Sequence, residues 1–301
     1  MMNLPTIRQL ECLVAVAENL NFRRAAESCF ITQPALSAQV QQLEGLLGVE
    51  LFERDRRRVL STAAGVELAD KARRILTQIR ELGEVARGHG GPLSGTLRLG
   101  VIPTVAPYLL PAALGVVHRR FPALRLLLRE DQTSELVRRL DQGELDVLLL
   151  ALEANLGGAE TRALFTDRFW LAVPSGHRLA TRKTATERDL EDEDVLLLED
   201  GHCLRDQALS LCQQIGIREL DDFRASSLTT LVQMVSSGNG VTLLPEMSLR
   251  VEATPARKLS LLRFRKSRPA RTIGLAWRPS SSRKADFRAL GEAITSGSRV
   301  G

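Results

Sequence analysis

One long helical repeat, from Thr62 to Arg87, constrains the fold of this chain more than any other feature of its sequence. Six apolar positions within it recur at alternating steps of four and three residues: Leu68, Ala72, Ile75, Ile79, Leu82 and Ala86. This heptad spacing predicts a helix of about 39 Å with a single apolar stripe. The stripe must be buried, either against a second copy of the same helix, which is the simpler arrangement, or against the chain's own N-terminal domain.

The repeat divides the chain into unlike parts. A glycine-rich segment, residues 89–95, follows it and has the composition of a hinge. We therefore expect a small domain over residues 1–61, a linker helix over residues 62–88, and a larger domain over residues 96–301. A length of 301 residues is also more than one hydrophobic core usually supports.

The first domain has the pattern of three short helices and a wing. The expected elements are helices over residues 6–19, 21–28 and 32–47 and a two-stranded wing over residues 51–60. Asn21 and Thr32 can cap the second and third helices, and Gly48 can end the third. The wing tip is basic, at Arg56, Arg57 and Arg58.

These helices predict a helix-turn-helix that reads DNA. Ala25 and Ala26 are small residues at a point where two helices must cross closely. The exposed face of the third helix carries short polar or compact side chains, at Thr32, Gln33, Pro34, Ser37 and Gln41. Such side chains at a helix N-terminus can enter the major groove and pair with base edges. The alternative is a helical hairpin with no ligand.

Net charge does not by itself indicate a nucleic-acid partner. The formal charge is +5, but residues 1–91 are almost balanced and the excess lies in residues 255–301. Hydrophobic residues make up 44% and charged residues 26%, as in soluble globular proteins. No apolar run is long enough for a membrane span, and the first residues lack the pattern of a secretory signal. We expect a cytoplasmic protein with no membrane partner.

The second domain has the pattern of two α/β lobes. Strands are expected over residues 96–101, 125–129 and 146–150, alternating with helices over residues 106–120 and 133–142. Further strands are expected near residues 169–173, 195–198 and 241–244, and the chain returns to the first lobe near residues 272–277. This order predicts parallel sheets with helices on their faces. Lobe I would comprise residues 96–166 and 272–301, lobe II residues 167–271, with a ligand cleft between them.

Two of the four cysteines lie where redox chemistry is favourable. Cys203 follows a strand and falls in the first turn of a helix that Asp200 or Gly201 can cap. The helix dipole favours a thiolate there, and Arg205 and a protonated His202 would act in the same direction. A thiolate attacks peroxide to give a sulfenic acid, which a second thiol can trap.

Cys212 is the available second thiol, but one continuous helix would hold it apart from Cys203. Nine residues correspond to about 13.5 Å and to opposite helix faces, whereas a disulfide needs Cα atoms within about 7 Å. The pair can close only if this helix unwinds. Ordinary half-buried cysteines remain the alternative, and a zinc site with His202 lacks a close cysteine pair and a fourth ligand. We expect no metal or cofactor, and we interpret Cys12 and Cys29 as core residues.

The N-terminal half resembles the LysR-type transcriptional regulators. The matching residues are Phe22, Ala25, Ala26, Gln33, Pro34, Ser37, Leu43, Glu44 and Leu51–Arg54. The resemblance covers the whole chain and implies a winged helix-turn-helix with a long linker helix and a two-lobed α/β domain like that of periplasmic binding proteins. It implies that Gln33, Pro34 and Ser37 face bases and that Arg56 to Arg58 reach phosphate or the minor groove. Gln41 and Gln42 depart from the basic residue that many members carry.

Residues 201–208, followed by Cys212, resemble the redox segment of the peroxide-sensing members of that family. The similarity extends to residues 101–111, 224–228, 242–245 and 271–275. It implies that hydrogen peroxide oxidises Cys203 and that Cys212 resolves the product. It also implies that a set of polar residues surrounds the peroxide: Thr104, Thr133, His202, Arg205 and Asp206. Thr104 and Thr133 could instead be plain helix caps, and Arg205 and Asp206 a surface pair.

The resemblance implies a homotetramer that binds promoter DNA and RNA polymerase and controls oxidative-stress genes. Two other readings stay open. In one, a small organic effector binds the cleft and the cysteines are incidental. In the other, the chain is a thiol peroxidase-like enzyme that uses Cys203 for catalysis, which the helix-turn-helix disfavours.

Overall fold

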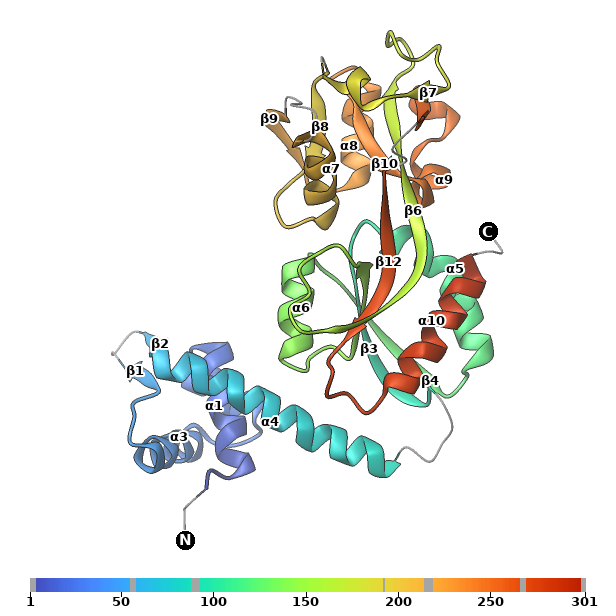
Figure 1. The fold of residues 1–301 in the computed structure, drawn as a ribbon. Helices are drawn as coiled ribbons and strands as arrows, with labels where there is room; N and C mark the ends of the chain where they lie inside the picture. Colours follow the sequence, from blue (N-terminus) through green and yellow to red (C-terminus); the bar gives the residue numbers. More distant parts are fainter. Residues whose placement is uncertain are drawn as a thin grey trace. The chain divides into compact units, whose positions relative to one another are not determined.

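The computed structural model describes residues 4–54, 58–87, 93–191, 193–213, 219–265 and 269–298. Contacts divide the chain into two compact units, one formed mainly by residues up to His89 and the other by residues from Gly90 onward. Figure 1 shows both units. No helix among the described residues is long and apolar enough to cross a membrane.

The first unit contains the expected helices and wing. Its elements are α1 (Ile7–Asn19), α2 (Phe22–Ser28), α3 (Gln33–Leu47), β1 (Phe52–Arg54), β2 (Val59–Ser61) and α4 (Ala63–Arg87). The Asn21 side chain caps α2 by accepting hydrogen bonds from two backbone N–H groups, and Gly48 ends α3 at φ +69°. Thr32 occupies the cap position of α3, but its side chain makes no capping hydrogen bond, so that detail of the prediction is wrong.

A small hydrophobic core joins these helices. Ala25 and Ala26 are buried, as the close crossing of α2 requires. Three residues of α3 point into the same core: Leu36, Val40 and Leu43. The core holds α3 in place while leaving its other face exposed.

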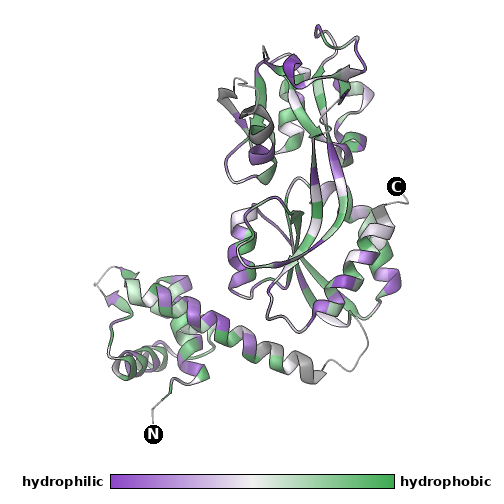
Figure 2. Cartoon of the chain, viewed as in Figure 1, coloured by the Kyte–Doolittle hydropathy of each residue, from purple (hydrophilic) through white to green (hydrophobic). Residues whose placement is uncertain are grey.

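The apolar stripe of α4 is buried at its N-terminal end and exposed further along. At the N-terminal end, Ala69 and Ala72 are buried in the core of the first unit, and Leu68 packs against it. Further along, the stripe is exposed in the single chain: Ile75 is 43%, Ile79 38% and Leu82 76% exposed. Packing on the chain's own domain thus accounts for the first turns only. Figure 2 shows hydrophobic and hydrophilic residues alternating along α4.

Lobe I of the second unit is built on a five-stranded mixed sheet. The strand order is β4 (Leu124–Glu130), β3 (Gly95–Val101), β5 (Val147–Ala151), β12 (Ala270–Trp277) and β6 (Glu160–Pro174). Its helices are α5 (Ala106–Arg120), α6 (Thr133–Asp141) and α10 (Lys284–Ser298). Strands β3, β4 and β5 are parallel, while β12 is antiparallel to both of its neighbours.

The predicted parallel pairing is confirmed for β3, β4 and β5 but does not extend to β12 and β6, and the reason is topological. Strands β6 and β12 carry the chain between the lobes in opposite directions, so they pair antiparallel (Figure 1). Residues 160–168 of β6 pair with β12, and residues 169–174 pair with strands of lobe II. One long strand thus belongs to both lobes.

Lobe II surrounds the far half of β6. Its strands are β7 (Thr184–Ala185), β8 (Val195–Leu198), β9 (Glu219–Ala225), β10 (Thr242–Pro245) and β11 (Leu259–Phe264). Its helices are α7 (Cys203–Gln213), α8 (Leu228–Ser236) and α9 (Leu249–Glu252), with single 3-10 turns at Glu187–Leu190, Glu246–Ser248 and Pro255–Arg257. Strands β10 and β11 pair antiparallel with β6, whereas β8 and β9 pair in parallel.

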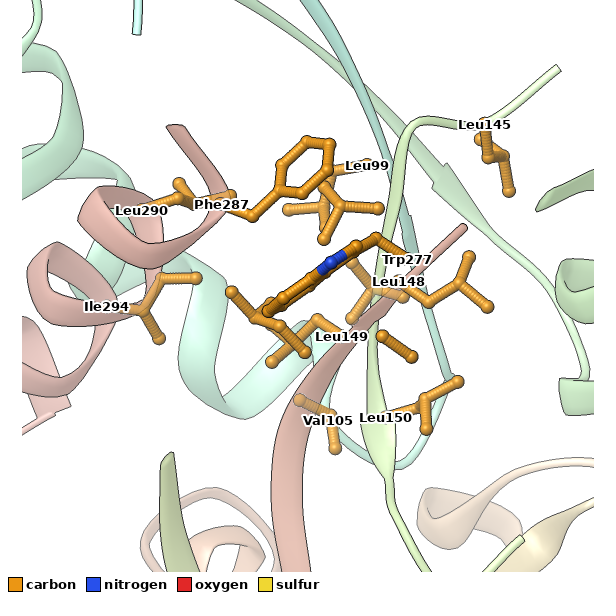
Figure 3. Close-up of a cluster of buried hydrophobic side chains, with 14 of the residues drawn as sticks. Leu99, Val105, Leu145, Leu148, Leu149, Leu150, Trp277, Phe287, Leu290 and Ile294 are labelled. Atoms are coloured by element: carbon orange, nitrogen blue, oxygen red, sulfur yellow. The ribbon is translucent and has the colours of Figure 1, made fainter. Parts of the chain in front are cut away.

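Each lobe has its own hydrophobic core. In lobe I, the rings of Trp277 and Phe287 lie 5.4 Å apart and pack with leucines of β3 and β5 (Figure 3). In lobe II, one cluster lies under α8 and a second lies on the other side of the sheet. Cys203 is the exception, because it lies on α7 of lobe II but packs with the core cluster of lobe I.

Candidate functional site: a buried thiol between two lobes

The DNA-facing residues predicted from the sequence lie together on the first unit. Thr32, Gln33, Pro34 and Gln41 are exposed and Ser37 is half-buried, all at or near one face of α3. These positions lie beside the stripe of core residues Leu36, Val40 and Leu43 and do not belong to it. The geometry of the helix therefore leaves these side chains available to a groove of DNA.

The predicted wing pairs as expected, with β1 antiparallel to β2. Arg58 is exposed just before β2. Arg56 and Arg57 lie outside the described residues. Arg58 is thus the predicted wing-tip arginine that the described residues include.

Cys203 begins α7 and is buried between the lobes. Its side chain is 5% exposed. Adjacent residues of the helix face the other way, since Leu204 and Ala208 pack in the cores of lobe II. The first turn of α7 therefore places the Cys203 thiol at the junction of the two lobes.

The surroundings of Cys203 oppose its ionisation on balance. Burial raises the pKa of the thiol above its ordinary value, and the charge of Asp206 acts in the same direction. The positive charge of Arg271 lowers the pKa, as do contacts with the Thr133 side chain and the Ala151 backbone. A lowered pKa, expected from the helix dipole with Arg205 and His202, is therefore not what the structure shows.

The Thr133 hydroxyl is a buried polar group close to the thiol. The residue is 8% exposed, and Oγ1 has no hydrogen bond of good geometry among the described residues. It lies close enough to Cys203 to lower the thiol's pKa. A buried hydroxyl without a partner is costly, so a small polar ligand that bonds to it would be stabilised.

Arg271 is the charged centre of the junction. Its side chain is fully buried on β12, and Nε lies 3.0 Å from Oδ2 of Asp167 on β6. Nη1 donates to the Thr104 hydroxyl at 2.8 Å, and Nη2 to the Thr104 carbonyl at 2.9 Å. Burial raises the pKa of Asp167, against the effect of Arg271. This network fixes a guanidinium beside the thiol.

The other three predicted residues, His202, Arg205 and Asp206, lie at the start of α7. Arg205 is buried, and its Nε donates to Asp200 Oδ1 at 2.9 Å within lobe II. His202 is buried 3.8 Å from Glu199, and burial lowers its pKa, so at neutral pH it is not the cation expected from the sequence. Asp206 is exposed, but its charge still acts on the thiol.

Polar contacts also join α7 and the loop before it to lobe I. Gln207 Nε2 donates to Glu153 Oε2 at 3.3 Å, and Gln132 Nε2 donates to the Asp200 carbonyl at 3.4 Å. Gly201, at φ +96°, lies so close to Gln132 that a Cβ would clash with its side chain. Movement of α7 would therefore break contacts between the lobes.

Cys212 lies in the same helix as Cys203, since α7 is continuous from Cys203 to Gln213. The expected separation of about 13.5 Å along the axis follows from that continuity. Within the described part of the chain, no group of three or more potential metal ligands occurs. Cys203 is a free thiol in this state.

Sequence reasoning assigned no role to Arg271 or Asp167. The sequence does carry a signal for Arg271, because it is a lone charge at the start of an otherwise apolar strand. Its partner lies 104 residues earlier in the chain, at Asp167, and only the pairing of β6 with β12 brings them together.

Comparison with known proteins assigns the class. Residues 7–66 match the model of bacterial regulatory helix-turn-helix proteins of the lysR family, and residues 90–299 match the LysR substrate binding domain. The chain belongs to the LysR family of bacterial regulatory proteins.

Within this family the chain is similar to proteins named OxyR. It is 45% identical to the DNA-binding transcriptional dual regulator OxyR of Escherichia coli over 96% of this chain and 94% of that protein. A full-length OxyR variant from Pseudomonas aeruginosa matches with a TM-score of 0.79 and 32% identity, over 97% of this chain and 98% of that one. An H2O2-bound cysteine-to-serine variant of Corynebacterium glutamicum OxyR matches with a TM-score of 0.69 and 37% identity, over 100% and 94%.

Proposed function

We propose that this chain is a peroxide-responsive transcription regulator that binds promoter DNA. Hydrogen peroxide oxidises Cys203, which then forms a reversible disulfide with Cys212. The main structural support is the position of the Cys203 thiol at the lobe junction, beside the Arg271 guanidinium and the Thr133 hydroxyl. Relatives named hydrogen peroxide-inducible genes activators support the assignment.

The proposed reaction uses the groups at the junction. The Cys203 thiolate attacks one oxygen of hydrogen peroxide, an S–O bond forms, and the O–O bond breaks. The leaving hydroxide takes a proton and departs as water, with Arg271 stabilising the negative charge and Thr133 holding the peroxide. The Cys212 thiol then attacks the sulfenic sulfur, so that an S–S bond forms and a second water leaves.

The second step requires α7 to open, because one helix keeps the two cysteines apart. Opening removes the contacts that Gln207 and Cys203 make with lobe I. The disulfide would therefore change how the lobes pack. We propose that residues 89–95 form a hinge between this domain and the DNA-binding part.

The proposed DNA contacts follow the exposed face of α3 and the wing. Thr32, Gln33, Pro34, Ser37 and Gln41 would meet bases or sugars, whereas Arg56, Arg57 and Arg58 would meet the backbone. His202, Arg205 and Asp206 would support the sensing segment from around α7. We propose that the chain acts in the cytoplasm, as a sensor and not as an enzyme, and contacts RNA polymerase at its promoters.

We also propose a dimer through α4 and a tetramer of such dimers. The exposed Ile75, Ile79 and Leu82 support a contact with a second α4. Replacing Ile75 with Asp would bury an unpaired charge there. Sedimentation of Ile75→Asp should show a smaller species with weaker DNA binding, and an unchanged oligomer would contradict the α4 contact.

The test of the proposed function is a map of disulfides after brief exposure to peroxide. Tryptic cleavage places Cys203 and Cys212 on separate peptides, residues 189–205 and 206–218. These two peptides should be linked in the parent and unlinked after addition of reductant. Cys203→Ser should abolish the link, and combined with Cys12→Ala and Cys29→Ala it should also abolish the change in promoter binding. Cys212→Ser should stop at a sulfenic acid or proceed to irreversible oxidation.

The same experiment separates the rival in which an organic effector binds the cleft. In that case Cys203→Ser would keep its transcriptional response, and the peptides would stay unlinked at peroxide concentrations that activate the regulator. Either result would overturn the two-thiol mechanism.

A further inference from the structure

The DNA-binding unit contains a second pair of thiols, Cys12 and Cys29. Cys12 lies on α1 and is fully buried, while Cys29 is the C-cap residue of α2 and is half-buried. Cys12 belongs to the hydrophobic core of this unit and Cys29 packs against it; the Cys29 thiol donates to the backbone carbonyl of Glu11, the residue before Cys12, at 4.0 Å. The sequence interpretation treated them as separate core residues; the packing of α1 on α2 makes them neighbours.

A cation lies beside this pair. Arg8 Nη2 donates to the backbone carbonyl of Cys29 at 2.7 Å, and Nη1 pairs with Glu11 at 2.7 Å. The Arg8 charge interacts with both cysteines. A positive group next to a partly accessible thiol is the setting in which cysteines are oxidised.

The two thiols are not equivalent. Burial and the neighbouring Cys29 raise the pKa of Cys12 to about 11, in spite of Arg8. Cys12 therefore stays protonated near neutral pH. Cys29 is the partner that solvent can reach, so it is the one that meets an oxidant first.

We propose that Cys12 and Cys29 form a redox site in the DNA-binding unit, a dithiol that a hydroperoxide converts to a disulfide. The Cys29 thiolate attacks the peroxide, an S–O bond forms and the O–O bond breaks, and the leaving hydroxide takes a proton to become water. The Cys12 thiol attacks the sulfenic sulfur, the S–O bond breaks, and a second water leaves. The two thiols supply the two electrons that reduce the peroxide.

The site is placed to act on DNA recognition. Cys29 is followed by Phe30 at φ +56° and, two residues further on, by Thr32, which occupies the N-cap position of α3. An S–S bond of about 2.05 Å is shorter than any contact between two thiols. Oxidation must therefore draw the end of α2 toward α1 and shift the turn that sets α3. The oxidised unit should bind DNA more weakly.

The test uses the full chain carrying Cys203→Ser, so that its result does not depend on the regulatory thiol. After peroxide, free thiols are alkylated and the protein is digested without reductant. Cys12 falls on residues 9–23 and Cys29 on residues 25–54, with no other cysteine on either peptide. We expect these peptides to be linked, with the loss of two hydrogens. The proposal is overturned if Cys12 is recovered fully alkylated, or if Cys29 is linked to Cys212.

Two matched variants, each in the Cys203→Ser background, complete the test. Cys12→Ala removes the resolving thiol and should leave Cys29 trapped by a sulfenic-acid reagent. Cys29→Ala should leave Cys12 reduced. A mixture of isotopically light and heavy chains should give no mixed linkage, since the bond forms within one chain; mixed linkage would contradict the site.

Fluorescence anisotropy with promoter DNA then measures the consequence. Peroxide should raise the Kd of the Cys203→Ser chain several-fold, and reductant should restore it. The Cys29→Ala variant in the same background should keep its Kd after peroxide. An unchanged Kd in a sample shown to carry the Cys12–Cys29 bond would overturn the link to DNA recognition.

Discussion

The two cysteine pairs of this chain differ in how the fold places their members. Cys203 and Cys212 lie nine residues apart on one helix, which holds them apart in space. Cys12 and Cys29 lie on different helices, yet they pack in the same small core. Separation in sequence therefore does not indicate separation in space. A helix keeps residues of its own length apart, whereas the packing of two helices brings distant residues together.

The cations beside the two pairs differ in the same way. Arg271 is fully buried and paired with Asp167, whereas Arg8 is partly exposed and paired with Glu11. A buried guanidinium is costly to disturb, and a surface one is not. The Arg271–Asp167 ion pair thus contributes to the stability of its domain, whereas the Arg8–Glu11 ion pair contributes little.

Replacement of the two arginines gives the largest expected difference. Arg271→Gln leaves Asp167 buried without its partner and should lower the free energy of unfolding by about 3–5 kcal/mol. Arg8→Gln removes a surface pair and should change it by less than about 1 kcal/mol. Urea unfolding of the second unit can be followed by tryptophan fluorescence, because both tryptophans, Trp170 and Trp277, lie in it, and unfolding of the helical first unit by circular dichroism.

The matched control for that comparison is Asp167→Asn combined with Arg271→Gln. Removing both charges avoids an isolated buried ion, so the double variant should lose less stability than the two single losses added together. Additive losses would mean that the two groups do not act as a pair.

Local opening of the helices is the next contrast. Closing the Cys203–Cys212 bond requires α7 to unwind, at a cost of about a few kcal/mol of local structure. Amide exchange across residues 203–213 should therefore speed up on oxidation of the parent and less so in Cys212→Ser. Exchange in α1 and α2 should not speed up, because Cys12 and Cys29 lie on separate helices and their bond requires neither helix to unwind. Equal exchange in α7 before and after oxidation would contradict the unwinding.

The sequence predicted those parts of the molecule that depend on local patterns. The apolar spacing predicted α5 and β8 to the residue, and the exposed face of α3 followed from the same periodicity. The first half of β6 was missed because residues 160–166 form a sheet edge on which exposed and half-buried positions mix. Nothing local marks that segment as a strand.

The parts that could not be predicted depend on pairing across long distances. Arg271 meets Asp167 only through the crossing of β12 and β6, and Cys29 meets Cys12 only through the packing of α1 and α2. The bond of Arg205 to Asp200 also depends on the fold, since it is set by the start of α7 against the loop before it. A helix N-terminus indicates where a thiol lies, but burial decides its pKa.

The pH dependence of Cys203 oxidation is a smaller effect, and it tests whether burial raises the pKa of this thiol. Since the pKa of Cys203 is raised, the thiolate is the minor form at neutral pH and its fraction grows about tenfold per pH unit until the pKa is passed. The rate of Cys203 oxidation should therefore rise about tenfold per unit between pH 6 and 8. Quantifying the alkylated peptide 189–205 after timed exposure measures it. A flat rate would show that the thiolate already predominates.

The smallest expected effect is the one that separates the two pairs. Cys12→Ala combined with Cys29→Ala removes both cysteines of the DNA-binding unit and leaves the sequence of the second unit unchanged. The Cys203–Cys212 link should therefore form at the parental rate, within about twofold, as measured by the linked peptides 189–205 and 206–218. A Cys203→Ser chain provides the zero of that scale. If the double variant is slowed well beyond twofold, electrons pass between the pairs by thiol exchange, and the chain holds one four-cysteine relay in place of two independent sites.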